Sequence, residues 1–306
     1  MTRAPRLPAA ALIVAAACAG CRPALDDRPW LVTSPQIVGI KVEPAESPPG
    51  SEVSLQAITL DPAGPLDPAA TVWSLCRSGK PLGENRVVAE SCLGADPAAA
   101  DALGSPATLV IPATACQLFG PDTPQPAPGA PPSRPRDPDA TGGYYQPISG
   151  DLSGSLAIGL ARITCGLPDA SLAASRAFLA AYHANRNPTV TGLSFEIDGA
   201  AADPAAIPRG ARVSIRAAWL DGDAEPFALF DRQTRTVVEQ RESLAAAWYV
   251  TGGQLEIAAA EISDPAVMSA ATVWVAPDAP GSWELVGVLR DSRGGSDAIR
   301  ATLQVR

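Results

Sequence analysis

Apolar and polar residues alternate with a period of two in many short segments of this chain. The alternation is clearest at residues 53–57, 213–219 and 299–305. At this period, one side of an extended strand faces a core and the other faces water. Short strands separated by turns, with almost no helical periodicity, predict an all-β chain built of antiparallel sandwiches.

Several of these segments occur twice in the same order. Residues 34–42 match 187–195, and 50–57 match 210–217 without a gap. Further along, Trp73 corresponds to Trp248, and residues 107–111 correspond to 271–275. An internal duplication of this kind predicts two tandem domains of one architecture, which we place at residues 35–185 and 186–306.

The segments between the matched strands predict turns and one long loop. The polar, glycine-rich segment 291–296 precedes the last strand and predicts a hairpin. The segment 121–143 is rich in proline, which lacks the donor that a sheet ladder needs, so we predict a Pro-rich insertion loop over 117–149. Residues 171–182 have helical propensity, but the repeat requires a final strand before the second domain, and we predict a strand over 176–182.

Four features together resemble bacterial immunoglobulin-like domains, of which the PKD and cadherin-like modules of surface lipoproteins are the relatives. These are a strand after Asn-Pro, a strand opening on Pro-x-Gly, a central Trp, and the closing hairpin from Trp283 to Gly295. The resemblance covers most of residues 35–306 and implies tandem sandwiches. It implies little about function, because that fold supports many unrelated roles.

The first twenty residues have the pattern of an export signal. Arg3 and Arg6 precede an apolar run over 7–17 that is too short to span a bilayer permanently. The ending Cys18-Ala19-Gly20-Cys21 resembles a lipobox, which implies cleavage after residue 20, acylation of Cys21 and a tether over 21–34. Two alternatives remain: acylation of Cys18, and an A-x-A site at 17–19 for ordinary signal peptidase.

The cysteine count favours Cys21 as the lipidated residue. Its acylation removes Cys18 with the signal and leaves four thiols, an even set that suits an oxidising compartment. These four are Cys76, Cys92, Cys116 and Cys165. We predict that Cys76 pairs with Cys92 and that Cys116 pairs with Cys165, which closes the ends of the two polar insertions. The alternative pairing joins Cys76 to Cys165 and Cys92 to Cys116.

Charge and hydropathy restrict the partners. The formal net charge is −9, with no basic patch, so we expect no nucleic-acid partner. The expected membrane contact is the lipid anchor, since no apolar run after Cys21 is long enough for a transmembrane helix. Arg22 is not the Asp that retains lipoproteins at the inner membrane in some bacteria. We therefore expect a cell-envelope protein of the outer membrane, facing the periplasm or the cell surface.

Catalytic motifs are absent from the sequence. The single histidine, His183, has no neighbouring motif, and neither a nucleophile elbow nor a phosphate-binding glycine loop occurs. The acidic segment 221–225 offers oxygens to Ca²⁺, but the ion needs six to eight ligands, so we expect a solvated acidic turn, no metal and no cofactor.

The sequence therefore favours a non-enzymatic protein for interaction, adhesion or envelope scaffolding. Its partner would be an unknown envelope protein or glycan. The alternative is a carbohydrate- or peptidoglycan-binding module, for which exposed aromatic residues on one face would be diagnostic. The candidates for that role are Trp30, Tyr144 and Tyr145, whereas Trp73, Trp248, Trp274 and Trp283 lie on expected strands and are expected in the core.

Overall fold

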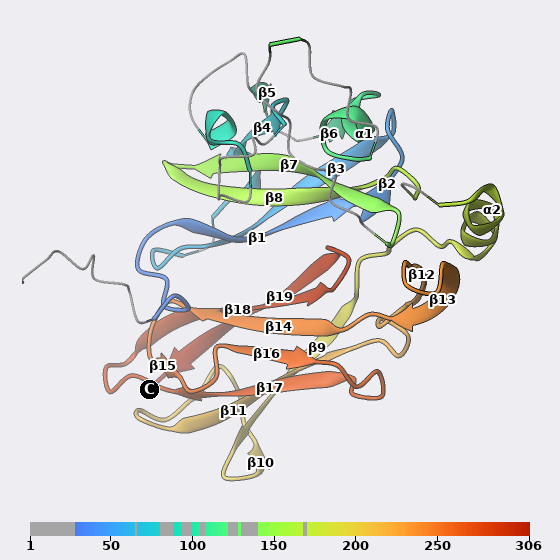
Figure 1. Cartoon of the computed structure of the whole chain (residues 1–306). Coiled ribbons are helices and arrows are strands. Elements are labelled where there is room, and N and C mark those ends of the chain that lie inside the picture. The colour runs from blue at the N-terminus through green and yellow to red at the C-terminus, as the bar shows by residue number, and fades with distance from the viewer. Residues whose placement is uncertain are drawn as a thin grey trace, which may run out of the picture.

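The computed structural model describes residues 28–64, 66–79, 88–93, 100–104, 108–121, 128–129, 140–167 and 170–306. The expected signal peptide, Cys18 and Cys21 lie outside these residues, as does most of the proline-rich segment. The regular structure of the described chain is mostly antiparallel β-sheet, arranged as two sandwiches that lie one above the other in Figure 1. The predicted all-β fold class is confirmed.

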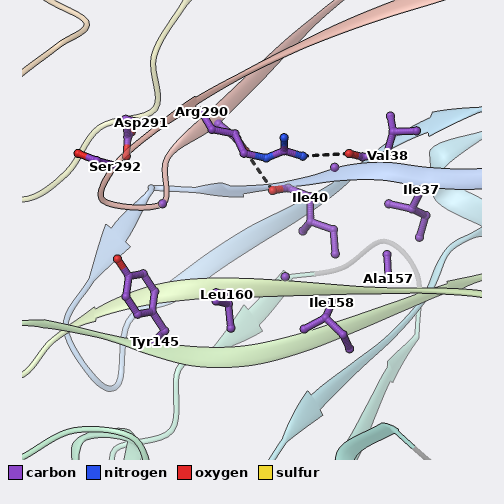
Figure 2. Close-up of a pocket in the computed structure, with 14 residues that line it drawn as sticks. Ile37, Val38, Ile40, Tyr145, Ala157, Ile158, Leu160, Arg290, Asp291 and Ser292 are labelled. Carbon is purple, nitrogen blue, oxygen red and sulfur yellow. Dashed lines mark hydrogen bonds between the residues drawn. The ribbon is translucent and has the colours of Figure 1, made fainter. Parts of the chain in front are cut away.

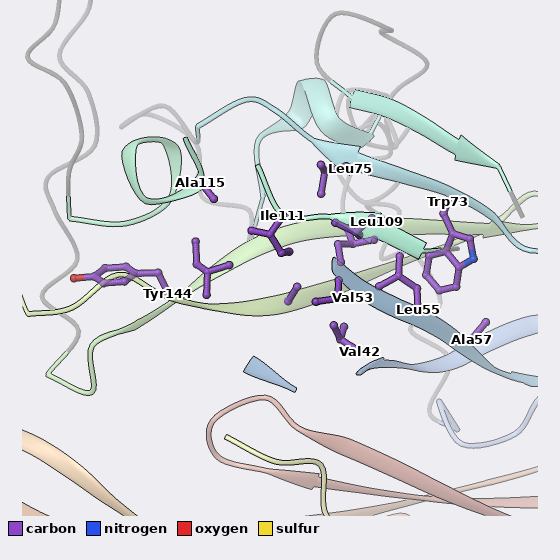
Figure 3. Packing of buried hydrophobic residues seen from close by; sticks show 13 residues of the cluster. Val42, Val53, Leu55, Ala57, Trp73, Leu75, Leu109, Ile111, Ala115 and Tyr144 are labelled. Atoms are coloured by element: carbon purple, nitrogen blue, oxygen red, sulfur yellow. The ribbon is translucent and has the colours of Figure 1, made fainter. Parts of the chain in front are cut away.

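The first sandwich has one three-stranded and one five-stranded sheet. The first sheet has the order β1 (Gln36–Glu43), β3 (Glu52–Leu60), β6 (Thr108–Val110). The second has the order β2 (Glu46–Ser47), β8 (Ser155–Thr164), β7 (Gly143–Leu152), β4 (Val72–Cys76), β5 (Ala100–Gly104). The alternating residues Val53, Leu55 and Ala57 face the core, where they meet Trp73 and Leu75 from the opposite sheet (Figure 3).

The second sandwich repeats this plan. One sheet has the order β10 (Ala200–Ala201), β9 (Val190–Ile197), β11 (Arg212–Trp219), β17 (Ser269–Val275), β15 (Gln254–Leu255). The other has the order β16 (Ala259–Ile262), β14 (Leu244–Val250), β18 (Gly281–Asp291), β19 (Ser296–Val305). Trp248 and Trp274 are fully buried between them, as Trp73 is in the first sandwich.

The duplication read from the sequence has a direct structural counterpart. In the first sandwich β3 pairs with β1 on one side and β6 on the other, and in the second β11 pairs in the same way with β9 and β17. The Trp-bearing strands β4 and β14 each pair with the first strand of a closing hairpin, β7–β8 or β18–β19. The predicted hairpin around residues 291–296 is confirmed.

Two expectations about the end of the first sandwich are wrong, and one missed strand explains both. The insertion loop was expected to extend to residue 149, but β7 begins at Gly143 and pairs along its whole length with β8. Because β7 was missed, the closing strand of the first sandwich was sought too late in the chain. That closing strand is β8, and residues 176–182 lie mostly in the α-helix α2 (Leu172–Ala181), as their propensity indicated.

Short helices and one extra hairpin complete the chain. The short elements are η2 (Pro68–Ala70), η3 (Glu90–Leu93) and α1 (Ala115–Leu118). The strands β12 (Pro226–Asp231) and β13 (Thr236–Arg241) form a separate hairpin between β11 and β14, and α2 packs against it. The only fully buried side chain of α2 is Phe178, and a side chain at Gly142 would come within 2.8 Å of its ring.

The two sandwiches are stacked face to face, so that their sheets form four layers (Figure 1). The outer face of β1–β3 packs on the outer face of β14–β18–β19. This interface has its own apolar cluster, made of Val32, Val38, Ile58, Leu60, Val286 and Val288. On β3, Ile58 and Leu60 thus belong to the interdomain cluster, while Val53, Leu55 and Ala57 belong to the first core.

The end of the expected tether is part of this packed body. Trp30 is 8% exposed in the second core and Val32 is fully buried between the sandwiches. The backbone of Trp30 and Val32 exchanges two hydrogen bonds with Val250, at 3.0 and 2.9 Å. The tether was expected to extend to residue 34, but the apolar side chains of 30–32 join the second sandwich before the first one begins.

Candidate binding site between the sandwiches

Glu46 and Arg162 form a buried ion pair on the first-sandwich side of the interface. Arg162 Nε donates to Glu46 at 3.0 Å, and the same carboxylate accepts hydrogen bonds from the Thr164 and Tyr182 hydroxyls and from the backbone N–H of Asn185. The guanidinium also donates to Thr141 Oγ1 at 2.8 Å. Gly143 is required beneath it, because a Cβ there would overlap the guanidinium. We call these residues, Glu46, Arg162, Thr164 and Tyr182, the Glu46 cluster.

A second buried group of charges lies on the second-sandwich side. Arg293, in the turn between β18 and β19, donates to Glu242 at 2.5 Å, to Glu225 at 3.2 Å and to the His183 carbonyl at 3.0 Å. Asp291 accepts from the backbone N–H groups of Arg293 and Gly295, at 2.8 and 2.9 Å. We call Arg293, Glu225, Glu242 and Asp291 the Arg293 cluster. All four are at most 8% exposed.

The two clusters differ in the number of carboxylates for each buried guanidinium, and the pKa values of their carboxylates differ accordingly. Burial alone would raise the pKa of Glu46, but the Arg162 charge and the bonds from Tyr182 and Asn185 hold that pKa below its usual value. In the Arg293 cluster three carboxylates surround one buried guanidinium. Burial, and then the Asp291 charge, raise the pKa of Glu242 to about 7. Burial also raises the pKa of Asp291, against its hydrogen bonds from Gly295 and Arg293.

The segment between α2 and β9 joins both clusters. Asn185 is 2% exposed; its backbone N–H reaches Glu46, and its Nδ2 lies 3.2 Å from both carboxylate oxygens of Asp291. Tyr145 of β7 donates to the Arg293 carbonyl at 3.2 Å, and the Arg162 guanidinium lies over its ring. Residues 184–188, which separate the two repeats, are therefore held by both sandwiches.

Side chains of the second sandwich also cover the free edge of β1. The carbonyls of Val38, Ile40 and Val42 accept from Arg290 Nη2 at 2.9 Å, Ser296 Oγ at 3.0 Å and Asn187 Nδ2 at 2.8 Å. β1 lies at the edge of its sheet, so these groups would otherwise be open to pairing with another chain. The interface therefore satisfies an edge strand as well as burying apolar surface.

A cleft of about 390 Å³ opens at the margin of this interface (Figure 2). Its walls are β1, the strand β8 and the turn between β18 and β19. The cleft is lined mainly by apolar side chains and by backbone, including Ile37, Ile40, Ile158 and Leu160, with Arg290 as its cation. Its volume is within the usual range of ~300–1,000 Å³ for ligand sites. No sequence signal singled out these residues, because they come from three segments far apart in the chain.

The cysteine pairs of the structure are the predicted ones. Cys76 is bonded to Cys92 and Cys116 to Cys165, with Cα–Cα distances of 5.3 and 5.6 Å. Both distances suit a disulfide. Cys116 lies in α1 and Cys165 directly follows β8, where its backbone N–H donates to the Gly142 carbonyl just before β7. The second bond therefore links the start of the long insertion to a residue beside its end. Disulfides of this kind indicate an extracytoplasmic compartment.

The acidic segment 221–225 uses its carboxylates within the protein. Asp223 accepts from the backbone N–H groups of Thr189 and Leu220, each at 3.0 Å, and burial is the main cause that raises its pKa. Glu225 belongs to the Arg293 cluster and also pairs with Arg186. In the described part of the chain, no group of three or more His, Cys, Asp or Glu side chains could hold a metal ion.

The aromatic residues considered for sugar binding are not exposed. Trp30 and Tyr144 are buried at 8% and 5% exposure, and Tyr145 is half-buried against Arg162. Trp73, Trp248 and Trp274 are core residues as expected, and Trp283 is half-buried at the edge of the second core. All fifteen aromatic residues of the sequence lie among the described residues, and none of them is exposed.

Comparisons with known proteins find only remote structural likeness. No protein-family model matches the chain, and no curated protein matches it. Solved structures with partial likeness include fibronectin(III)-like modules of Clostridium thermocellum CbhA, at 10% identity and a TM-score of 0.23, over 87% of this chain and 93% of that one. The Yersinia pseudotuberculosis adhesin InvE has 11% identity and a TM-score of 0.21, over 87% and 58%.

Escherichia coli alpha-2-macroglobulin has 11% identity and a TM-score of 0.23, and the match covers 90% of this chain but only 22% of that one. The chain thus spans about a fifth of that protein. At such TM-scores these likenesses do not extend to a shared function. Within the described residues there is no helix long and apolar enough to cross a membrane.

Proposed function

We propose that this chain is a lipid-anchored, extracytoplasmic protein that acts without catalysis, by binding another envelope protein at the cleft between its sandwiches. The lipid anchor rests on the signal pattern and on Cys21, and the compartment rests on the same pattern together with the two disulfides. The anchor fixes the chain to a membrane, and the stacked sandwiches present the cleft at a constant geometry.

The use of the buried ionisable groups is the observation that carries the proposal. Strongly shifted pKa values often mark catalytic groups, but ion-pair networks that hold a structure together shift them too. Glu46 and Asp291 both accept from Asn185 of the segment that links the sandwiches, and Glu242 accepts from Arg293, which also donates to the His183 carbonyl of that segment. The cleft beside them offers apolar side chains and backbone, which is the chemistry of a polypeptide-binding surface.

The carbohydrate alternative has lost its support. It depended on exposed aromatic rings on one face, and none of the fifteen aromatic side chains is exposed. A sugar-binding face would then have to rely on polar side chains alone.

A photo-crosslinking experiment in whole cells tests the proposal. A benzophenone amino acid replaces Ile158 in the cleft, and a control variant carries it at Val238 on β13; the two positions are 37% and 39% exposed. We expect an adduct with another envelope protein from position 158 and none from position 238. Equal adducts at both positions, or sedimentation of the protein with purified peptidoglycan and no protein adduct, would contradict the proposal.

Metabolic labelling with a fatty-acid probe tests the anchor separately. We expect the label to be lost in Cys21→Ala and retained in Cys18→Ala. Retention in Cys21→Ala together with loss in Cys18→Ala would move the anchor to Cys18, and no label in the wild-type chain would show release by ordinary signal peptidase.

A further inference from the structure

Strand β8 has a free edge along most of its length. It is the second strand of its sheet, but its outer neighbour β2 pairs only with Arg162 and Ile163. The part of β8 from Ser155 to Ala161 therefore pairs with β7 alone, and residues 157–160 of this part line the cleft. Free edges of this kind are templates for pairing with another chain.

The register of the β7–β8 hairpin determines which residues of β8 direct their backbone N–H and C=O groups away from β7 and toward the cleft. The two turn residues, Ser153 and Gly154, have φ values of 53° and 86°, and Leu152 is opposite Ser155. A two-residue hairpin begins with a hydrogen-bonded pair, and bonded and non-bonded pairs then alternate. Odd-numbered residues of β8 thus bond to β7, while Leu156, Ile158 and Leu160 direct their N–H and C=O groups outward.

These outward groups are unpaired within the described part of the chain. Neither the sheet pairing nor the other hydrogen bonds of the structure give a partner to the N–H or C=O of Leu156, Ile158 or Leu160. The facing edge of β1 is different, because Arg290, Ser296 and Asn187 satisfy three of its carbonyls. The second sandwich therefore supplies hydrogen bonds to the backbone of β1 on one side of the cleft, while the outward backbone groups of β8 on the other side have no partner within the described residues.

We propose that the free edge of β8 binds an extended peptide segment of another protein, which adds to the sheet as a further strand within the cleft. Outward donors and acceptors recur every second residue, a spacing of about 6.6–6.8 Å, which another extended backbone matches. The site deepens the proposed function, on which it rests, by naming the strand that a partner protein would contact.

The surroundings of the edge specify the peptide further. The cleft is continuous with the interdomain interface. Residues at the β18–β19 turn donate hydrogen bonds to β1 and also form the wall of the cleft opposite β8. Ile158 is exposed at the cleft, and Ile37 and Ile40, which are partly buried against the first core, also line it. These three side chains offer apolar surface to alternate residues of the peptide.

Arg290 lines the cleft and donates one N–H to the Val38 carbonyl, while the carboxylate of Asp291, which also lines it, already accepts from Asn185, Arg293 and Gly295. An acidic residue on the peptide complements the charge of Arg290.

Proline substitution separates edge binding from folding. Ile158→Pro removes one outward N–H, and it leaves the ladder with β7 intact because that N–H does not bond to β7. Ile158→Val keeps the backbone donor and an apolar side chain and is the matched control. Ile158→Lys keeps the backbone but places a charge on the edge, and serves as a second variant should Ile158→Pro not fold.

A phage-displayed library of random heptapeptides, selected on the full mature chain, supplies the probe. We expect enriched sequences with alternating apolar residues and an acidic residue. One lost hydrogen bond together with the proline ring should weaken binding by about tenfold or more in Ile158→Pro, while Ile158→Val stays within about threefold. Ile158→Lys should bind as weakly as Ile158→Pro. Failure to enrich any peptide, or equal binding to the wild type and both disruptive variants, would overturn the proposal.

Amide exchange followed by NMR tests the geometry without any assumption about sequence. In the free protein, the amides of Leu156, Ile158 and Leu160 should exchange faster than those of Ala157 and Gly159, and a selected peptide should protect the first set. Protection of all five in the free monomer would overturn the inference. Sedimentation of the wild type and Ile158→Pro distinguishes a second copy of this chain as the occupant, since a dimer lost in Ile158→Pro would replace the foreign peptide.

The two proposals fail in different ways. A protein adduct from position 158, with peptide binding that Ile158→Pro does not change, would leave the proposed function standing and remove the edge site. Peptide binding that depends on the edge, with no adduct in cells, would do the reverse.

Discussion

The ion pairs at the centres of the Glu46 cluster and the Arg293 cluster are both buried, yet the pKa of Glu46 is shifted in the opposite direction to those of Glu242 and Asp291. In the first, one carboxylate faces one guanidinium and collects four donors, and the pKa of Glu46 is lowered. In the second, three carboxylates share one buried guanidinium, with Arg186 only at the rim, and the pKa of Glu242 and Asp291 is raised. Burial alone therefore does not decide the behaviour of a charged interface, because the local charge balance sets its sign.

Removing Arg162 or Arg293, the arginine of either cluster, should lower the free energy of unfolding more than any other change considered. Arg162→Met and Arg293→Met each leave buried carboxylates uncompensated, and a loss of roughly 3–5 kcal/mol in the free energy of unfolding is expected. Lys41→Met is the control, since Lys41 and its partner Asp297 are 24% and 20% exposed, and the change should be within ~1 kcal/mol. Urea unfolding measures all three.

The same variants distinguish the two clusters. The loss in Arg162→Met should shrink at mildly acidic pH, because burial raises the pKa of Glu46 once Arg162 is gone, while the wild-type carboxylate stays ionised. Protonation of Glu242 should not change the loss in Arg293→Met between pH 4.5 and 7, because Glu242 of the wild type already takes up its proton at about pH 7. Equal losses in all three variants, independent of pH, would mean that the buried charges do not hold the sandwiches together.

Removing the disulfide beside the Glu46 cluster should give the next largest loss in the free energy of unfolding. Cys165 follows Thr164, a donor to Glu46, and its bond to Cys116 spans 49 residues. Replacing both cysteines by alanine should cost about 4 kcal/mol in the chain-entropy model, against about 3 kcal/mol for the 16-residue separation of Cys76 and Cys92. Thermal and urea unfolding test this order, and non-reducing peptide mapping checks the pairing. A peptide joining Cys76 to Cys165 would refute it.

The pH dependence of stability should show the opposite signs directly. Because the pKa of Glu242 is raised from 4.5 to about 7, the folded chain binds more protons than the unfolded one between these values. This contribution to stability is complete below pH 4.5 and is lost as the pH rises to about 7, with a slope of at most about 1.4 kcal/mol per pH unit. Glu46, whose pKa is lowered, contributes above pH 4.5 and loses that contribution in stronger acid.

Glu242→Gln is the matched variant for this measurement. The difference between its stability and that of the wild type should vary between pH 4.5 and 7 and be flat above pH 7. A difference that is flat throughout would show that Glu242 is ionised in the folded chain at all these values.

Local pattern predicted the strands and their duplication, but it could not predict the interface. Alternation marked Val53, Leu55 and Ala57 as core residues, and the burial agrees. Ile58 and Leu60 continue the same strand toward a second apolar cluster, and nothing in the local pattern says that a second sandwich will cover them. β7 was missed because it follows a proline-rich segment and contains Pro147, which favours a loop on composition alone.

The candidate site was beyond the reach of the sequence for a related reason. Glu46, Arg162 and Arg293 are separated by more than a hundred residues from one to the next, and each looks like an ordinary surface residue in its own segment. Two glycines carried a signal that could have been used. Gly143 and Gly295 each lie where a Cβ would overlap a charged partner, Arg162 or Asp291. Both follow another glycine in the sequence, but a Gly-Gly pair is also what a turn requires.

The smallest expected effect concerns α2, which leads into both clusters. Ser171 caps the helix, its hydroxyl accepting from the Ala174 N–H at 3.1 Å, and Ser171→Ala should cost about 1 kcal/mol. Tyr182, directly after the helix, donates to Glu46, while the carbonyl of the next residue accepts from Arg293. When the helix frays from its capped end, it opens at the buried Phe178 before it reaches the contacts of Tyr182 and His183 with the two clusters. Amide exchange should therefore become faster in α2 and stay unchanged in β14 and β18.

Ser175→Ala, inside the helix, is the control and should not destabilise it, because alanine is the better helix former. If Ser171→Ala instead quickens exchange across the whole interface, α2 holds the two clusters together and they unfold as one unit.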